Sequence, residues 1–442
     1  MTQHFETLVI GGGPAGIAAA VCAAENGVNV GLIDDNPDTG GQIWRTGVKS
    51  KPHVSHGRPA AEWRRRLSAV RVTSLHRWSV FDQPSPNTLR AEHGGEAASF
   101  SYDNLILATG ARERFLPFPG WTLPNVMGVG AIQAMVKGGL PIRGKRVVIA
   151  GSGPLLLAVA ASLKAAGAVV VCVCEQASIS KLLPFVLSLV ATPAKLAEGI
   201  RYKAATWQTP FYTSSWPIGM QALPPNHTDS PLAVTLSIHG SLKTIACDYL
   251  ACGFHLVPNI ELPALLGCEL TKGAVTVNEW QQTSVPGIYC AGETTGIGGL
   301  ELSLIEGQIA GFTAADKTDK AHRLFAQKRK LSRFATRLET AFALRSVLKA
   351  LPENGTLLCR CEDVPYGAVR EHPSWRAAKL HTRCGMGPCQ GRVCGSAAEF
   401  LLGWNVDSVR PPVFPALISS LGFKQAFDEP EESPEFETAT KI

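Results

Sequence analysis

The chain has 442 residues, 45% of them hydrophobic, with 43 glycines, 30 prolines and a formal net charge of +6 at pH 7. This length has room for two or three domains, and the composition is ordinary for a globular α/β protein with many turns. The modest charge does not indicate a nucleic-acid-binding protein. The 12 cysteines are too sparse for a secreted disulfide scaffold. No apolar run is long enough to span a membrane, and the N-terminus lacks the cationic region of a signal peptide. We therefore expect a soluble cytoplasmic protein, with peripheral contact to the inner membrane left open.

The clearest motif lies in residues 6–34. An apolar run meets three closely spaced glycines, an alanine-rich segment follows, and a second apolar run ends in an aspartate. This order predicts a strand, a tight turn, a helix and a second strand, which is the dinucleotide fingerprint in its usual context. The first glycine permits the turn, the second lets a pyrophosphate approach, and the third brings helix and strand together. The helix N-terminus would bind the phosphates, and the aspartate would accept hydrogen bonds from a ribose diol. The candidate residues are Gly11, Gly13, Pro14, Ala15, Gly16 and Asp34. The alternative is a glycine-rich turn in an ordinary α/β domain.

Two later segments are candidates for the same cofactor site. Gly41 and Gln42 follow a turn after the second predicted strand, and we expect them either to return toward the cofactor or to form a surface loop. Residues 105–107 form an apolar run that ends at Thr109 and Gly110. In flavoproteins with two dinucleotide-binding units, such a strand end passes close to FAD, and the glycine permits that approach.

Residues 284–311 form another informative region. A short predicted strand, residues 288–291, is followed by Gly292 and Glu293, and a helix is predicted from about Leu300. An acid at this strand end can accept a hydrogen bond from a ribityl hydroxyl, and the following helix N-terminus can point its dipole at the flavin ring. The alternative is that Glu293 only caps the helix.

Residues 143–175 repeat the first unit, and this repeat predicts a second nucleotide-binding domain. Gly151 and Gly153 stand in its turn, and Glu175 ends its second strand. Leu156 replaces the third glycine, so the unit either binds an adenine nucleotide or keeps only the fold. If a pyridine nucleotide binds, Glu175 favours NAD(H), because an acid there repels a 2′-phosphate.

Downstream, residues 316–351 are strongly basic, with apolar side chains at helical spacing. We predict a connecting helix packed on the core rather than a nucleic-acid-binding segment.

Five of the 12 cysteines crowd into residues 359–394, as C-R-C followed by CGMGPCQGRVC. Thiolates brought together from two turns suit a [2Fe–2S] cluster. The main rival is a structural zinc site, although zinc knuckles are usually C-x₂₋₄-C and C-x-C is tight for one. Free thiols remain a third alternative. Only four ligands are needed, so one cysteine is surplus. The flavin-binding segments contain no C-x₂-C or C-x₄-C pair, so we do not expect disulfide reduction.

With these residues in view, the chain resembles the α-type subunits of heteromeric FAD-dependent amine dehydrogenases. This group includes the α-type subunit of opine oxidase, the corresponding subunit of hydrogen cyanide synthase and the α subunits of hydroxyproline and proline dehydrogenases. The resemblance runs from residue 8 to about residue 396. The combination of its segments is specific, whereas no single segment is. Its segments are IGGGPAG, DDNPDTGGQIWR, LILATGARER, AGSGPLLLAVA, YCAGETTGIGGLELSLIEGQIAG, CRCEDV and TRCGMGPCQGRVCG.

The resemblance implies an α/β protein with a glutathione-reductase-like double Rossmann fold and a small C-terminal helical iron–sulfur domain like that of bacterioferritin-associated ferredoxin. The residue at Cys384 varies in the family, so the implied ligands are Cys359, Cys361, Cys389 and Cys394. The implied division of the chain is an FAD-binding part at 1–140, a second nucleotide-binding domain at 141–255, a return to the FAD-binding domain at 256–315, a basic helical linker at 316–352, the [2Fe–2S] domain at 353–425 and a disordered acidic tail at 426–442.

The implied function is electron transfer in an amino acid or opine dehydrogenase or oxidase. Amine oxidation would occur in a separate glycine-oxidase-like β subunit with its own flavin. A small ferredoxin-like γ subunit is a further candidate partner, and a respiratory acceptor would take the electrons. FAD and [2Fe–2S] are the expected cofactors, with NAD(H) or another adenine nucleotide as candidate for the second site. The alternatives are a free-standing NAD(P)H-dependent FAD oxidoreductase and a structural subunit that binds nucleotide and zinc. No residue stands out as a catalytic acid or base.

Overall fold

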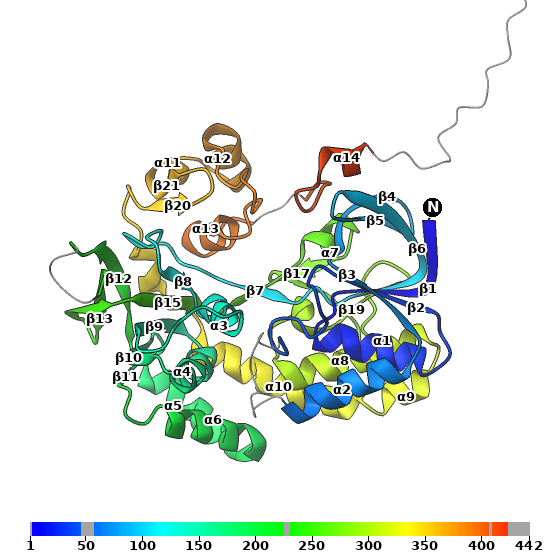
Figure 1. Cartoon of the computed structure of the whole chain (residues 1–442), viewed down its shortest axis with the longest axis horizontal. Helices are drawn as coiled ribbons and strands as arrows, with labels where there is room; N and C mark the ends of the chain where they lie inside the picture. Colours follow the sequence, from blue (N-terminus) through cyan, green and yellow to red (C-terminus); the bar gives the residue numbers. More distant parts are fainter. Residues whose placement is uncertain (1, 46–56, 225–229, 406–408, 423–442) are drawn as a thin grey trace, which may run out of the picture.

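The computed structural model describes residues 2–45, 57–224, 230–405 and 409–422. Two separate sheets, each built around a parallel βαβ unit, lie side by side and are joined by a narrow ribbon and a long helix (Figure 1). A group of short helices follows near the ribbon. The acidic tail predicted at 426–442 lies outside the described residues. The predicted α/β fold with two Rossmann-type units is confirmed.

The first sheet has the strand order β3-β2-β1-β6, with β19 and the antiparallel strands β5 and β4 beyond β6. Strand β2 and the carboxyl-terminal halves of β1, β6 and β19 are apolar runs that are buried on both faces, as expected for central parallel strands. The first fingerprint supplies two adjacent central strands, whose carboxyl ends form one edge with those of β6 and β19. The strands are β1 Thr2–Ile10, β2 Val30–Asp34, β3 Val72–His76, β4 Ser79–Ser85, β5 Thr88–His93, β6 Glu96–Leu107 and β19 Ile288–Cys290.

Two helices, α1 (Pro14–Ala24) and α8 (Leu300–Ala314), pack closely on one face of this sheet. A Cβ atom at Gly307 would lie 2.1 Å from the carbonyl oxygen of Ala15, and one at Gly311 would lie 2.3 Å from that of Ala19. Only glycine therefore fits at these two positions of α8. The other face is covered by α7 (Glu261–Leu265) and the β17–β18 hairpin, Leu270–Thr271 and Ala274–Val275. Helix α2 (Gly57–Ala69) lies beside α1.

The second sheet is entirely parallel, with the order β11-β10-β9-β15-β8. Helices α3 and α4 cover one face, where Leu156 is 1% exposed in the core. A three-stranded antiparallel sheet, β12-β13-β14, covers the other face. The elements are β8 Val126–Gly128, α3 Val129–Lys137, β9 Arg146–Ser152, α4 Leu155–Ala165, β10 Val169–Glu175, β11 Phe211–Tyr212, β12 Ser215–Ala222, β13 Leu232–Ile238, β14 Ser241–Cys247 and β15 Tyr249–Phe254.

Two connections join the sheets. Strands β7 (Ala111–Glu113) and β16 (Leu256–Pro258) form an antiparallel ribbon between them. The predicted basic helix is α10 (Phe325–Phe342), preceded by α9 (Thr318–His322) and followed by η3 (Ser346–Ala350). It begins against α8 and ends against α5 (Ile179–Ser188), so it packs on the core as predicted (Figure 1). Helix α5 continues through η1 (Leu189–Ala191) to α6 (Pro193–Ala205).

The C-terminal part is mainly helical and has its own small core. Its elements are β20 Leu357–Cys359, β21 Val364–Pro365, α11 Tyr366–Arg370, α12 Trp375–Thr382 and α13 Cys394–Leu402. Residues 409–422, which include α14 (Ile418–Leu421), return to the first sheet, where the Val413 N–H donates to the Phe81 carbonyl at 2.8 Å. Among the described residues, no helix is both long and apolar enough to cross a membrane.

Candidate functional site

The Gly-rich turn between β1 and α1 has the shape that its sequence predicts. Gly11 has a φ of +104°, which favours glycine. A Cβ at Gly16 would lie 1.8 Å from the Gly11 carbonyl oxygen, so the third glycine brings helix and strand together. A Cβ at Gly13 would meet no atom within 4 Å, which leaves space above the turn. Pro14 begins α1 directly after it, and Ala15 is buried beneath. Turn and helix terminus together form a cradle that fits a pyrophosphate.

Asp34 closes this turn at the end of β2. It is 6% exposed, and its carboxylate accepts hydrogen bonds from the Gly12 N–H and, at 2.7 Å, from the Asn36 N–H. The Asn36 side-chain amide also donates to this carboxylate, at 2.8 Å. A carboxylate has about four acceptor positions, so about one is left for a ribose hydroxyl. The following loop returns to the turn, because the Gly40 N–H donates to the Gly12 carbonyl at 2.7 Å. Gly41 lies against Gly13, whereas the neighbouring Gln42 is exposed.

Thr109 and Gly110, at the end of β6, lie in a hydrogen-bonded group of three segments. The Thr109 hydroxyl is 3.2 Å from that of Thr294 and donates to the Asn259 carbonyl at 2.8 Å. The Gly110 N–H donates to the Thr294 hydroxyl at 3.0 Å, and the Asn259 side-chain amide donates to the Thr109 carbonyl at 2.9 Å. Thr294 and Asn259 are functional-site candidates that sequence reasoning missed. Their only signal was position: Thr294 directly follows the candidate Glu293, and Asn259 lies near the predicted return to the FAD-binding domain at residue 256.

Glu293 lies in η2 (Gly292–Thr295), directly after β19. One carboxylate oxygen accepts from the Gly299 N–H at 3.0 Å, so the side chain does cap the region before α8. The other oxygen, Oε2, is buried and has no hydrogen-bond partner among the described residues. Burial raises the pKa of this carboxyl to about 6. A buried acceptor without a partner fits the predicted contact with a ribityl hydroxyl.

A second buried acid, Glu306 on α8, supports the same turn. Its carboxylate accepts from the Gly292 N–H at 2.9 Å and from the Thr295 hydroxyl at 3.0 Å. Burial raises its pKa to about 7. Sequence reasoning did not select this residue, because only the tertiary fold places α8 under η2.

In the second unit, the chain itself contacts the turn where a nucleotide was a candidate. A Cβ at Gly151 would lie 1.8 Å from the Gly253 carbonyl oxygen, whereas one at Gly153 would meet no atom within 4 Å. Glu175 is 1% exposed and accepts from the N–H groups of Gly153 and Ala177, both at 2.8 Å. Burial raises its pKa to about 7.

Residues 342–345, directly after α10, cross these strand ends, and we call them the strap. The Ser152 hydroxyl donates to the Phe342 carbonyl at 2.9 Å. The Gln176 side-chain amide donates to the carbonyls of Phe342 and Ala343, and its oxygen accepts from the Arg345 N–H at 3.2 Å. The strap is therefore hydrogen-bonded both to the Gly-rich turn and to the residue that follows Glu175.

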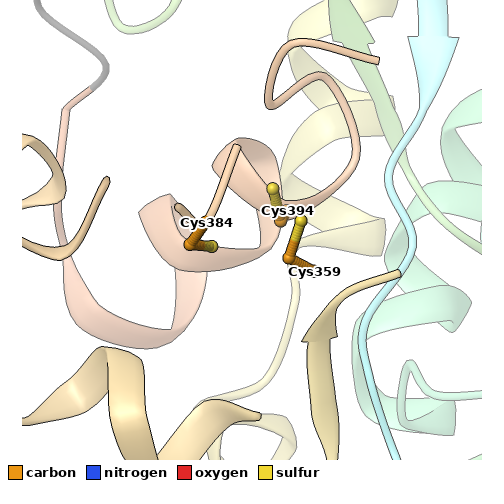
Figure 2. A group of neighbouring side chains, drawn as sticks. All are labelled: Cys359, Cys384 and Cys394. Atoms are coloured by element: carbon orange, nitrogen blue, oxygen red, sulfur yellow. The ribbon is translucent and has the colours of Figure 1, made fainter. Parts of the chain in front are cut away.

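Three of the five clustered cysteines form a buried group of thiols. The Sγ atoms of Cys359, Cys384 and Cys394 all lie within 4.8 Å of one another (Figure 2). Cys359 ends β20, Cys394 begins α13, and Cys384 lies in the loop after α12. Hydrogen bonds from Cys384 and Cys394 lower the pKa of Cys359, and the same hydrogen bonds raise the pKa values of Cys384 and Cys394, so the negative charge of the trio lies on Cys359.

The other two cysteines lie beside this group and nearer the surface. Cys361 is exposed, Cys389 is half-buried, and their side chains interact with each other. Gly387 abuts Cys361, because a Cβ there would lie 2.4 Å from the Cβ of Cys361. The fold thus brings the C-R-C turn and residues 384–394 together as predicted. It places the surplus Cys384, rather than Cys361 or Cys389, in the buried trio. An all-thiol donor set of this kind fits an iron–sulfur cluster.

Residues 5–315 match the family model described as pyridine nucleotide-disulphide oxidoreductase. The chain is 30% identical to the HcnB subunit of hydrogen cyanide synthase from Pseudomonas protegens, covering 89% of this chain and 90% of the relative. It is also 30% identical to the A-type subunit of opine oxidase from Rhizobium meliloti, covering 93% and 97%. These relatives match the group that the motifs indicated.

Solved structures show the same fold. L-proline dehydrogenase from P. horikoshii superposes with a TM-score of 0.63 at 17% identity, over 96% of this chain and 81% of that one. Thioredoxin reductase from T. acidophilum gives a TM-score of 0.51 at 18% identity, over 74% of this chain and 99% of that one. The shorter coverage of the reductase leaves part of this chain without a counterpart in it.

Proposed function

The chain belongs to the pyridine nucleotide-disulphide oxidoreductase family, and from this premise we propose that it is the electron-transfer subunit of a heteromeric amine dehydrogenase or oxidase. Membership makes it an oxidoreductase and implies FAD. In the proposal, FAD binds the first unit, a [2Fe–2S] cluster binds the cysteines, and a partner flavoprotein oxidises an amino acid, an opine or another amine. Electrons then pass through this chain to a respiratory acceptor.

The cradle of the first unit would hold FAD. The turn at Gly13 and the N-terminus of α1 would bind the pyrophosphate, and Asp34 would orient the adenosine ribose. The unpartnered oxygen of Glu293 would accept a hydrogen bond from a ribityl hydroxyl, close to Thr109 and Gly110. When bound, FAD supplies two-electron chemistry, and the protein contributes binding, orientation and exclusion of water.

Cys359, Cys361, Cys389 and Cys394 would hold the cluster, with Cys384 as a neighbouring thiol. Cys359 and Cys394 are buried, while Cys361 and Cys389 face the outer edge, so a cluster bound by all four would lie partly toward the surface. A [2Fe–2S] cluster carries single electrons. A position near the surface suits exchange of those electrons with a partner.

The observation that carries this proposal is the combination of an FAD-type cradle and an all-cysteine site in one chain whose relatives are named as subunits. Both relatives are matched over at least nine-tenths of their own length. Each name describes one subunit of an enzyme, which supports a partner for this chain as well.

The proposal is tested by comparing the chain purified alone under anaerobic conditions with the chain coproduced with a partner flavoprotein. The isolated chain is expected to contain FAD, iron and acid-labile sulfide and to show no amine oxidation. Coproduction should yield a complex that oxidises an amine with an artificial acceptor. Amine turnover by the isolated chain would contradict the proposal. Zinc without iron would instead favour a structural subunit.

A further inference from the structure

The loop that carries Cys389 and Cys394 contacts a side chain of the ribbon that leads to the FAD-type unit. The Arg112 guanidinium, on β7, donates through Nε to the Arg392 carbonyl at 3.1 Å. Arg392 lies in the loop between Cys389 and Cys394, and its own N–H donates to the Cys389 carbonyl at 3.1 Å. Arg112 therefore contacts the backbone of the cysteine loop directly.

The same guanidinium also reaches the segments proposed to contact the flavin. Its Nη1 donates to the Asn259 side-chain oxygen at 2.8 Å and pairs with Glu261 at 2.9 Å. Asn259 in turn is bonded to both the carbonyl and the hydroxyl of Thr109. Bonds and hydrogen bonds thus connect Thr109, Asn259, Arg112 and the Cys389–Cys394 loop without a gap.

A second ion pair between ribbon and helix provides a comparison. Arg114, two residues further along, pairs with Glu399 of α13 at 2.9 Å. It fastens the same cysteine-bearing part, but no hydrogen bond links it to Asn259 or to residues 389–394 in the described residues. Both arginines therefore attach the cysteine-bearing part to the ribbon. Arg112, together with the ion pair between Arg392 and Glu261 at 3.9 Å, also links the two proposed cofactor sites, whereas Arg114 does not.

We propose that Arg112 is the positioning residue that sets the register of the cysteine loop against the flavin site and provides the contact path between the two. The inference rests on the proposed function. Along this path the reduced flavin is oxidised one electron at a time, with its protons released to solvent, and the oxidised cluster is reduced by each electron. An external one-electron acceptor, such as ferricyanide, then reoxidises the cluster.

The side chain contributes in two ways. Its hydrogen bonds join the two sites through bonded contacts, which couple donor and acceptor better than gaps through space. Its positive charge lies close to the loop that would carry a negative cluster, and Arg392 adds a second one nearby. Net charge and nearby hydrogen bonds are among the factors that set the potential of such clusters. Removing Arg112 should therefore lower the reduction potential of the cluster as well as slow the transfer.

The test compares holoprotein variants R112Q and R114Q by flash reduction of the flavin with a deazaflavin radical. Electron equilibration with the cluster is followed by visible spectroscopy, and the cluster potential is measured by a titration followed by electron paramagnetic resonance. R112Q should slow the equilibration about tenfold or more, the scale of a small misplacement of reacting groups. R114Q should stay close to the wild-type rate. An R112Q variant with full FAD and iron and a wild-type rate would overturn the inference.

Two further measurements test the same inference independently. Asn259→Leu breaks the path at the next link and should slow transfer similarly while leaving the cluster potential near that of the wild type. Trypsin should cleave after Arg392 faster in R112Q than in R114Q, even in protein without cofactors; equal cleavage counts against the positioning role. Wild-type protein that binds neither FAD nor iron would contradict the proposed function, whereas a normal rate in both path variants would contradict only this inference.

Discussion

At the scale of single residues, the question is which of the five clustered cysteines would bind the cluster. Three of the five clustered thiols are fully buried together, and one of these three, Cys384, is the residue that the family resemblance leaves out. Two of the proposed ligands, Cys361 and Cys389, are instead at the accessible edge. Burial alone would select Cys384, whereas the motif selects Cys389, so a substitution pair decides between them.

We expect Cys384→Ala to keep the cluster and Cys389→Ala to lose it. The first removes a thiol that the four ligands do not need, and the second removes a ligand. Iron content, at about two atoms per chain in the holoprotein, and the visible spectrum measure the outcome. A C384A protein without iron and without cluster absorbance, beside a C389A protein that keeps both, would show that Cys384 is the ligand.

Glu306 gives a residue-level prediction about stability and pH. Burial raises its pKa from 4.5 to about 7 in the folded chain. Below pH 4.5 both states are protonated; between pH 4.5 and 7 the unfolded chain loses its proton first, so the free energy of unfolding falls as pH rises. Glu306→Gln removes this loss, and its oxygen can still accept from Gly292 and Thr295. Above pH 7, the free energy of unfolding of the variant should exceed that of the wild type by about 1–3 kcal/mol.

That gain should vanish near pH 4.5, as measured by denaturant unfolding of the cofactor-free chain at both pH values. Glu301→Gln is the control on the same helix: it removes a carboxylate that is 48% exposed, together with its 2.7 Å ion pair to Lys195, and should bring no gain in stability. The explanation by burial fails if the gain of E306Q is the same at pH 4.5 and pH 8.

At the scale of elements, the pairing of α1 with α8 holds the two halves of the proposed FAD site together. The fingerprint helix and the helix after η2 are almost 300 residues apart in sequence, and Gly307 and Gly311 let their backbones approach. The pattern of apolar residues predicted both helices. It did not reveal their contact, because glycine spacing in α8 has meaning only once the partner backbone is known.

Gly307→Ala should therefore be strongly destabilising. The added methyl group would lie 2.1 Å from the Ala15 carbonyl oxygen, and forced overpacking of this kind costs typically about 1–3 kcal/mol. Gly199→Ala, within α6, is the control, because no atom lies within 4 Å of its added Cβ. This substitution should raise the free energy of unfolding by about 0.5–1 kcal/mol through helix propensity. Thermal unfolding compares the two. Equal melting temperatures would show that the helices separate at little cost.

At the scale of the whole molecule, the strap makes the two βαβ units unequal. Both keep the Gly-rich turn and the terminal acid, but only the second has residues 342–345 bonded across its strand ends. This contact depends on α10, which begins at the first sheet and ends at the second (Figure 1). The arrangement favours an electron-transfer subunit over a reductase that draws hydride from NAD(P)H.

Anaerobic mixing of the holoprotein with NADH should therefore leave the flavin absorbance unchanged for minutes, while dithionite bleaches it. The expected reason is that the strap is hydrogen-bonded at the strand ends of the second unit, where the pyridine nucleotide would bind. Stopped-flow spectroscopy provides the measurement. Bleaching within seconds of adding NADH would revive the alternative of a free-standing reductase.

The amino-acid sequence by itself determined the local parts: both βαβ units, the strand ends at Thr109 and Gly292, the basic helix and the clustered cysteines. These features follow from short-range periodicity, glycine positions and spacing, which act within a few tens of residues. Only the tertiary structure decided which thiols are buried together, that Glu306 supports the turn at Gly292, that the strap contacts the second unit and that Arg112 contacts both Asn259 and the cysteine loop. Each of these contacts links residues far apart in the chain, and their proximity depends on how whole elements pack.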